Sequence, residues 1–183
     1  MVTWYDEPMK AVFLDRDGTI NAGIPKYERV DSPDKVELLP NVLEGLSLLA
    51  ELDYTVFFVT NQAGLAEGII TQQDFDAINQ KVLDLIAPSG IKITGTFVCP
   101  HGENDNCGCR KPKPKLLTDA AEKYDINLTQ SWMIGDRLTD IHTGINAGTK
   151  TILVQTGALM EAPEATYTAA NLHEAVKYVV SSS

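Results

Sequence analysis

Short apolar runs alternate along the chain with segments in which apolar residues recur every three or four positions. Within each run the apolar residues are continuous, which is typical of strands in a sheet covered on both faces. We therefore expect five buried β-strands. They are predicted at residues 10–15, 55–60, 95–99, 132–136 and 151–154.

The segments between these runs have helical periodicity. Residues 72–87 carry apolar side chains at the spacing of one helix face. Thr71 precedes this segment and Asp74 follows three residues later, a capping-box pattern that predicts where the helix begins. Together the patterns predict helices at about 41–52, 72–87, 114–124, 138–147 and 171–180.

Alternating strands and helices predict a parallel sheet joined by right-handed crossovers. The chain has 183 residues, which is enough for one domain with a substantial core and short for two. We therefore expect a doubly wound α/β fold of about five strands in a single domain over residues 1–183, with helix 171–180 at its C-terminal end. No insertion is large enough for a separate cap domain.

Polar side chains follow the carboxyl ends of several predicted strands, where doubly wound sheets bind their ligands. Asp15 and Asp17 follow the first strand, Thr60 and Asn61 end the second, and Asp136 ends the fourth. Two carboxylates one residue apart can act as nucleophile and general acid at one reacting centre. A lone strand-end Asp is more often a cap or a turn former. Their joint occurrence favours a catalytic site that binds magnesium and a phosphate group.

All three cysteines lie in one short loop with a histidine, at residues 99–109. Cys99, His101, Cys107 and Cys109 offer enough ligands for a closed tetrahedral zinc site. A site with four protein ligands has no open position for water, so the zinc would be structural. The residues between the ligands are mostly small or polar, and a metal could order them. The alternative interpretation is free thiols near a turn.

The basic run RKPKPK at 110–115 follows this loop and could be read as a nucleic-acid patch. The whole chain, however, has 15 Lys and Arg against 25 Asp and Glu, a net charge of −10. That charge disfavours binding to nucleic acid or to an anionic membrane surface. Pro112 and Pro114 restrict the run to an extended approach to a helix, and we expect Lys113 and Lys115 to be merely solvated there.

No apolar stretch is long enough to span a bilayer. Three cysteines cannot all pair in disulfides, so a reducing cytoplasm is expected.

Four stretches resemble the motifs of the haloacid dehalogenase superfamily of phosphatases. They are DRDGT (15–19), VTNQ (59–62), RKPKP (110–114) and GDRLTD (135–140). The resemblance extends over a catalytic core of about residues 10–157. The cysteine–histidine loop is similar to that of the branch that contains the heptose 1,7-bisphosphate and histidinol-phosphate phosphatases.

The resemblance implies a magnesium-dependent phosphomonoesterase with an aspartyl-phosphate intermediate. Asp15 would be the nucleophile, and Asp17 would be the general acid and then the general base. The Asp15 side chain, the Asp17 backbone carbonyl and the Asp136 side chain would hold the magnesium. Asp140 would orient its neighbours. The remaining implied roles are phosphoryl binding by Thr60, Asn61 and Lys111, and substrate recognition by Arg110, Thr19 and Asn21.

Within this branch the substrate is a small phosphate ester. We expect the substrate to be heptose 1,7-bisphosphate, which would lose its 7-phosphate. Histidinol phosphate is the alternative, because a lysine at position 115 is more similar to the sequences of the histidinol-phosphate phosphatases. Residues 21–34 are interpreted either as an ordinary loop or as a flap in which Lys26 or Tyr27 reaches the substrate. A DNA 3′-phosphatase and a non-catalytic zinc-stabilised binding module are less favoured. The enzyme is expected to be a monomer.

Overall fold

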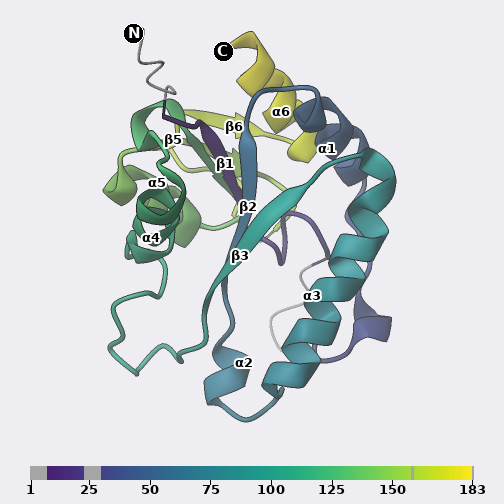
Figure 1. The fold of residues 1–183 in the computed structure, drawn as a ribbon. Coiled ribbons are helices and arrows are strands. Elements are labelled where there is room, and N and C mark those ends of the chain that lie inside the picture. The colour runs from purple at the N-terminus through teal and green to yellow at the C-terminus, as the bar shows by residue number, and fades with distance from the viewer. Residues whose placement is uncertain (1–7, 23–29, 158, 183) are drawn as a thin grey trace, which may run out of the picture.

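The computed structural model describes residues 8–22, 30–157 and 159–182. Its centre is a six-stranded sheet with the order β3-β2-β1-β4-β5-β6, in which all neighbouring strands are parallel (Figure 1). This confirms the prediction of a doubly wound α/β fold. The strands are β1 (Ala11–Leu14), β2 (Thr55–Asn61), β3 (Ile93–Cys99), β4 (Trp132–Gly135), β5 (Lys150–Val154) and β6 (Tyr167–Ala169).

Five of these strands match the predicted runs to within two residues at each end. The sixth strand, β6, was not predicted. It has only three residues, which are exposed, half-buried and buried in turn, so it lacks the continuous apolar character of the others. It adds to the outer edge of β5 through parallel pairing from Ile152–Tyr167 to Val154–Ala169.

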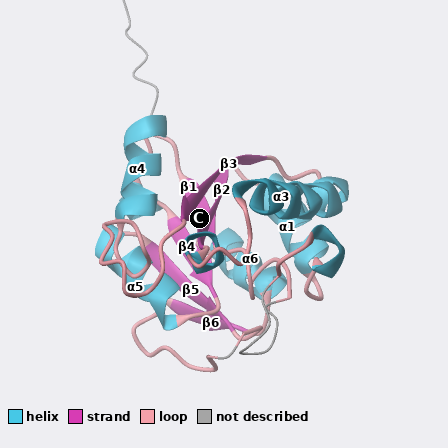
Figure 2. Cartoon of the chain, turned by 90° about the horizontal axis from the view of Figure 1, so that it is seen from below, coloured by secondary structure: helices cyan, strands magenta, loops and turns pink. Residues whose placement is uncertain are grey.

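Helices cover both faces of the sheet (Figure 2). On one face lie α1 (Val42–Ala50), α3 (Gln72–Ile86) and α6 (Leu172–Ser181). On the other lie α4 (Lys115–Tyr124) and α5 (Leu138–Ala147). Shorter helical segments are α2 (Ala63–Ala66) and 3₁₀ turns at Pro33–Lys35, Ala87–Ser89 and Leu128–Gln130.

The central strand β1 is covered on both faces, which explains why its sequence is continuously apolar. Val12 and Leu14 pack with residues of α1, α3 and α6, whereas Ala11 and Phe13 pack on the opposite face with residues of α4. All four side chains are fully buried. Burying a side chain the size of Phe13 contributes about 1.5–3 kcal/mol relative to its exposure. Each face of β1 therefore helps to hold one helical layer.

The predicted capping box at the start of α3 is confirmed. The Asp74 backbone N–H donates to Thr71 Oγ1 at 3.1 Å, and the Thr71 backbone N–H donates to Asp74 Oδ2 at 2.8 Å. Two of the N–H groups that a helix start leaves unpaired are satisfied in this way. Among the described residues, no helix combines the length and the apolar character needed to cross a membrane.

The order of the strands places the site. The chain runs from β1 outward to β2 and β3, and later returns to the other side of β1 with β4. The order in which strands are added to the sheet therefore reverses at β1. At such a point a crevice forms at the carboxyl ends of the neighbouring strands, here β1, β2 and β4. The α2 segment and the loop after β3 lie at this end of the sheet, opposite the start of β1 and the end of α6 (Figure 1).

Candidate active site

A pocket of about 540 Å³ lies at the carboxyl ends of β1 and β2. This volume is within the ordinary range for a small-molecule site. Asp15, Thr60 and Lys111 line it, and so do the apolar side chains of Ile69 and Leu138. Residues from motifs far apart in the sequence therefore meet in one pocket.

Asp15 and Lys111 form a buried ion pair at the floor of this pocket. Lys111 Nζ donates to Asp15 Oδ1 at 2.6 Å and to the Val59 carbonyl at 3.0 Å, and it lies 2.6 Å from Asp140 Oδ1. Burial raises the pKa of Asp15, and the charge of Lys111 opposes this effect. Burial alone would lower the pKa of Lys111, but the carboxylates of Asp140 and Asp15 outweigh it and raise that pKa. Lys111 is therefore a fixed positive charge.

Three carboxylates gather around this lysine. One oxygen from each of Asp15, Asp136 and Asp140 lies within 4.8 Å of the others, and all three residues are buried. Burial and the charge of Asp140 raise the pKa of Asp136 to about 6. Asp136 Oδ1 is buried and has no hydrogen-bond partner among the described residues. A buried oxygen without a partner, in a group of carboxylates, fits a hard divalent cation such as magnesium.

The Asp136 carboxylate occupies space that is free because two neighbouring residues are glycines without side chains. A Cβ atom at Gly157 would lie 1.8 Å from Asp136 Oδ2, and one at Gly18 would lie 2.4 Å from it. Gly18 also has a φ of +96°, which side chains rarely adopt. The Thr156 hydroxyl donates to the Gly18 carbonyl at 2.6 Å and joins the two loops. Backbone from two sides therefore encloses the Asp136 carboxylate.

Asp17 makes a separate set of contacts. Arg16 donates from Nε and Nη2 to its two carboxylate oxygens at 3.0 and 2.9 Å. Asn21 Nδ2 donates to Oδ1 at 2.9 Å and Gln62 Nε2 to Oδ2 at 2.7 Å. Burial alone would raise the pKa of Asp17, but the charge of Arg16 and these hydrogen bonds lower it. The Arg16 guanidinium is fully buried and lies 5.3 Å from the centre of the Phe75 ring.

Asn61 connects β2 to the segment that carries Lys111. The Lys111 backbone N–H donates to Asn61 Oδ1 at 3.0 Å, and Asn61 Nδ2 donates to the Lys111 carbonyl at 3.3 Å. The side chain of Asn61 is therefore used to hold this segment. Thr60, the preceding residue, is buried but lines the pocket.

Arg110 lines the same pocket beside Lys111. Its Nη1 donates to the His101 carbonyl at 3.0 Å, and its Nη2 lies 3.3 Å from Glu103 Oε1. Thr19 and Asn21, predicted to contact substrate, are buried and do not line this pocket as the described residues form it.

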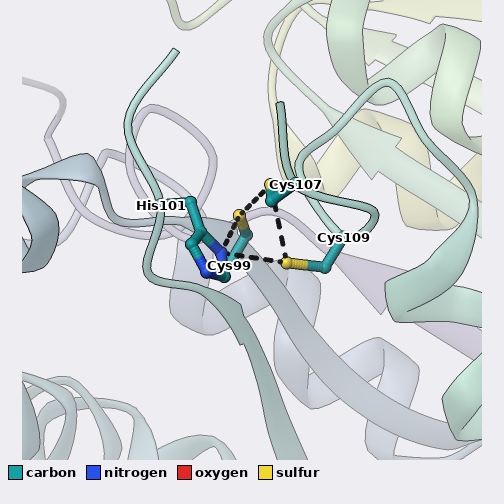
Figure 3. A group of neighbouring side chains, drawn as sticks. All are labelled: Cys99, His101, Cys107 and Cys109. Atoms are coloured by element: carbon teal, nitrogen blue, oxygen red, sulfur yellow. Dashed lines mark hydrogen bonds between the residues drawn. The ribbon is translucent and has the colours of Figure 1, made fainter. Parts of the chain in front are cut away.

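The four predicted zinc ligands come together in the loop after β3 (Figure 3). The Cys99 and Cys107 sulfurs are 3.6 Å apart, and Cys109 Sγ lies 3.4 Å from His101 Nδ1. A tetrahedral zinc with bonds of about 2.3 Å would separate its ligands by about 3.8 Å, so the arrangement fits this metal. All three cysteines are free.

The thiols differ in how readily they ionise. Burial raises the pKa of Cys99 to about 12. Burial also acts to raise the pKa of Cys107, but the backbone N–H groups of Arg110 and Cys109 outweigh it and lower this pKa to about 7. Metal binding requires thiolates, so a bound cation would have to draw the proton from Cys99.

Two expectations for lysines in the basic run need correction. Lys113 and Lys115 are exposed, as predicted, but they are not merely solvated. Lys113 Nζ donates to the carbonyl of Cys107, and Lys115 Nζ lies 2.7 Å from Asp119 Oδ1. Lys113 therefore helps to close the cysteine loop, and Lys115 forms an ion pair one turn along α4. The predicted flap residues Lys26 and Tyr27 lie outside the described residues.

Arg16 and Gln62 are among the residues of the site that sequence reasoning missed. Arg16 stands between Asp15 and Asp17, and a strand-end pair of buried acids needs a neighbouring cation; this was an available signal. Gln62 is the last residue of the VTNQ stretch, but its contact with Asp17 spans 45 positions and has no local pattern.

Comparisons with known proteins identify relatives of this chain. A family model described as HAD-hydrolase-like, for haloacid dehalogenase, matches residues 108–182. The D-glycero-beta-D-manno-heptose-1,7-bisphosphate 7-phosphatase of Bordetella bronchiseptica is 40% identical over 149 residues, which cover 81% of this chain and 82% of that protein. The protein of the same name from Helicobacter pylori strain J99 is 34% identical over 93% of this chain and 97% of its own length.

Solved structures give the same result. The D,D-heptose 1,7-bisphosphate phosphatase of B. bronchiseptica, crystallised with magnesium and phosphate, has a TM-score of 0.85 at 34% identity and covers 96% of this chain and 100% of that chain. A putative HAD-like phosphatase from Mesorhizobium loti has a TM-score of 0.82 at 28% identity over 95% of this chain and 85% of that chain. The fold and the carboxylate site define a haloacid-dehalogenase-like phosphatase. Within that class, the chain belongs to the family of the D-glycero-D-manno-heptose-1,7-bisphosphate 7-phosphatases.

The cysteine loop leads to a first prediction. Replacing Cys107 with Ser removes one thiolate, so purified protein should change from about one bound zinc per chain to almost none. If the metal contributes about 2 kcal/mol to the free energy of unfolding, Tm should fall by roughly 4–8 °C. Metal analysis and thermal unfolding measure the two effects. Asn104→Ser, an exposed change in the same loop, is the control. Unchanged Tm and zinc content in Cys107→Ser would refute a structural metal here.

Proposed function

We propose that the protein is a magnesium-dependent phosphomonoesterase that removes the 7-phosphate from D-glycero-D-manno-heptose 1,7-bisphosphate. The observation that carries the proposal is the position of Asp15. Its carboxylate lies at the carboxyl end of β1, is paired with Lys111 at 2.6 Å, and lines a pocket beside Asp136. The 40% identity to a protein named for this reaction supports the choice of substrate.

In the first step an Asp15 carboxylate oxygen attacks the phosphorus of the 7-phosphate. A bond forms between Asp15 and phosphorus, and the bond from phosphorus to the sugar oxygen breaks. Asp17 would first take up a proton from water, against the lowering of its pKa by Arg16 and its hydrogen bonds, and then give this proton to that oxygen, so the sugar leaves as an alcohol. Lys111 holds positive charge beside Asp15 throughout, which reduces repulsion between the carboxylate and the phosphate.

In the second step Asp17 acts as a general base. It takes a proton from water, and the water oxygen attacks phosphorus. The bond between phosphorus and Asp15 breaks, which restores the Asp15 carboxylate and releases inorganic phosphate. The arrangement of Asp17 supports this step, because its hydrogen bonds and the charge of Arg16 favour the ionised carboxylate.

The side chains of Asp15 and Asp136, with the backbone carbonyl of Asp17, would hold the magnesium. When bound, that ion offsets the negative charge of the carboxylates and of the transferring phosphate. The partnerless oxygen of Asp136 supports this assignment. Asp140 keeps Lys111 in place at 2.6 Å and would orient it toward Asp15.

The phosphoryl oxygens would be bound by the Thr60 hydroxyl, the Asn61 backbone N–H and Lys111. Arg110 is suited to a second phosphate, because its guanidinium lies on the pocket wall and is anchored to the His101 carbonyl. Thr19 and Asn21 remain predicted substrate contacts. Asn21 has a further contact that supports a role in the site, since it donates to Asp17.

The finer assignments are also proposals. Zinc at the cysteine loop (99–109) would fix the segment that carries Arg110 and Lys111. The three free thiols fit a reducing compartment, and we place the enzyme in the cytoplasm. We propose a single phosphatase domain over residues 1–183, with a catalytic core of about 10–157 and the helix predicted at 171–180, acting as a monomer. Histidinol phosphate is retained as the comparison substrate.

The nucleophile is tested by Asp15→Asn. An amide cannot form the acyl phosphate, so release of phosphate from 4-nitrophenyl phosphate should fall by about three orders of magnitude or more. The measurement is kcat with circular dichroism and zinc content as checks on folding. Asp53→Asn, an exposed change at the opposite end of β2, should retain wild-type activity. Full activity in folded Asp15→Asn would exclude the proposed mechanism.

Substrate choice is tested by kcat/KM. The value for D-glycero-D-manno-heptose 1,7-bisphosphate should exceed that for histidinol phosphate by about 100-fold or more, because histidinol phosphate has no second phosphate to bind Arg110. Replacing Arg110 with Ala should shrink this ratio more than it lowers activity on 4-nitrophenyl phosphate. A higher kcat/KM for histidinol phosphate would reverse the assignment.

The metal site is tested by Gly157→Ala. The added Cβ would meet Asp136 Oδ2 at 1.8 Å and displace this carboxylate. We expect the magnesium concentration for half-maximal activity to rise by about tenfold or more. Gly95→Ala is the control, since its Cβ would have only ordinary contacts of 3.7 Å or longer. An unchanged magnesium requirement in Gly157→Ala would argue against Asp136 as a ligand.

A further inference from the structure

Gln62 contacts two residues of the site at once. Its side-chain Nε2 donates to Thr60 Oγ1 at 2.9 Å and to Asp17 Oδ2 at 2.7 Å. The residue is 8% exposed and lines the pocket. Its own backbone N–H donates to the Cys99 carbonyl at 2.8 Å, which ties its position to the start of the cysteine loop. An amide nitrogen has two protons, and both are used here.

The contact with Thr60 sets the direction of the Thr60 hydroxyl proton. A hydroxyl has one proton to donate and two lone pairs that accept. One lone pair of Thr60 Oγ1 receives the Gln62 proton, so the hydroxyl proton must point elsewhere. Thr60 lines the pocket, and its free proton is therefore available to a phosphoryl oxygen.

Among the hydrogen bonds that Asp17 accepts, the one from Gln62 lies on the pocket side. Four hydrogen bonds hold the Asp17 carboxylate, and three of them come from Arg16 and Asn21, which are fully buried. The fourth comes from Gln62, which faces the pocket. A change at Gln62 therefore shifts Asp17 on its substrate side while the buried contacts stay in place.

We propose that Gln62 is a positioning residue that couples the phosphoryl-binding hydroxyl of Thr60 to the carboxylate of Asp17. Through one amide, the group that binds the phosphoryl oxygen and the group that protonates the leaving oxygen keep a fixed relation. This inference rests on the roles given to Thr60 and Asp17 in the proposed function. It gives a role to Gln62, which has none in the proposed function.

The test compares two kinds of phosphate ester. A sugar alkoxide is a poor leaving group and needs a well-placed proton donor, whereas 4-nitrophenolate leaves easily without one. In Gln62→Met, which keeps the size and removes both N–H groups, kcat for heptose 1,7-bisphosphate should fall by about 30–100-fold. For 4-nitrophenyl phosphate the fall should be about 3–10-fold, from the loss of Thr60 orientation alone. Inhibition by inorganic phosphate should weaken by a similar 3–10-fold.

Three further variants complete the experiment. Gln80→Met removes an exposed amide that donates to Asp84 on α3, and it should leave both esters unchanged. Gln62→Asn draws the amide back by one methylene and provides a mild change if Gln62→Met does not fold. It should also lower activity more on the sugar ester. In an Asp17→Asn background, Gln62→Met should cost no more on the sugar ester than on the aryl ester, because the acid it positions is gone.

Equal losses on the two esters in folded Gln62→Met or Gln62→Asn would overturn the inference, and so would no loss on either. The proposed function has its own test in Asp15→Asn. If Asp15→Asn is inactive and the Gln62 variants behave like wild type, only the role of Gln62 fails. If folded Asp15→Asn stays active, the proposed mechanism fails first.

Discussion

The buried ammonium group of Lys111 is the interaction on which the site depends. It lies 2.6 Å from carboxylate oxygens of both Asp15 and Asp140, and Asp136 is within 4.8 Å of the same cluster. When ionised, these three buried carboxylates outnumber the single buried ammonium, and the only other cation beside them is Arg137 at 3.9 Å from Asp136 Oδ2 among the described residues. The cluster therefore fits a divalent cation. Burial and the charge of Asp140 raise the pKa of Asp136.

The fold supplies these charges from opposite sides of one strand. β1 ends in Asp15, β4 leads into Asp136, and Asn61 at the end of β2 holds the backbone of Lys111 through two hydrogen bonds. Because β1 lies between β2 and β4, all three groups reach the same crevice. The layers on both faces of β1 are continuous apolar packing, so the charged groups have no space to withdraw into the sheet.

Much of the fold and of the candidate site could be predicted from the sequence, because both depend on patterns of neighbouring residues. Strand ends, the capping box of Thr71 and the four-ligand loop follow from spacing and side-chain type. The short strand β6 lacked such a pattern, since edge pairing with β5 rather than burial defines it. Gln62 was missed because its hydrogen bond to Asp17 joins segments 45 positions apart. Arg16 bonds its neighbour Asp17, so its place between two acids was a local signal. The burial of Thr19 and Asn21 could not be predicted either, because a motif identifies neighbours in sequence and not how deeply each side chain is buried.

The Cys99 residue belongs to two structures at once. Its sulfur is part of the four-ligand cluster, and its carbonyl oxygen accepts the backbone N–H of Gln62. At the other end of the loop, Cys109 directly precedes Arg110. Oxidation of these thiols would therefore disturb both walls of the pocket without touching a carboxylate. The proposed chemistry does not use these thiols, yet their oxidation would reach it through Gln62 and Arg110.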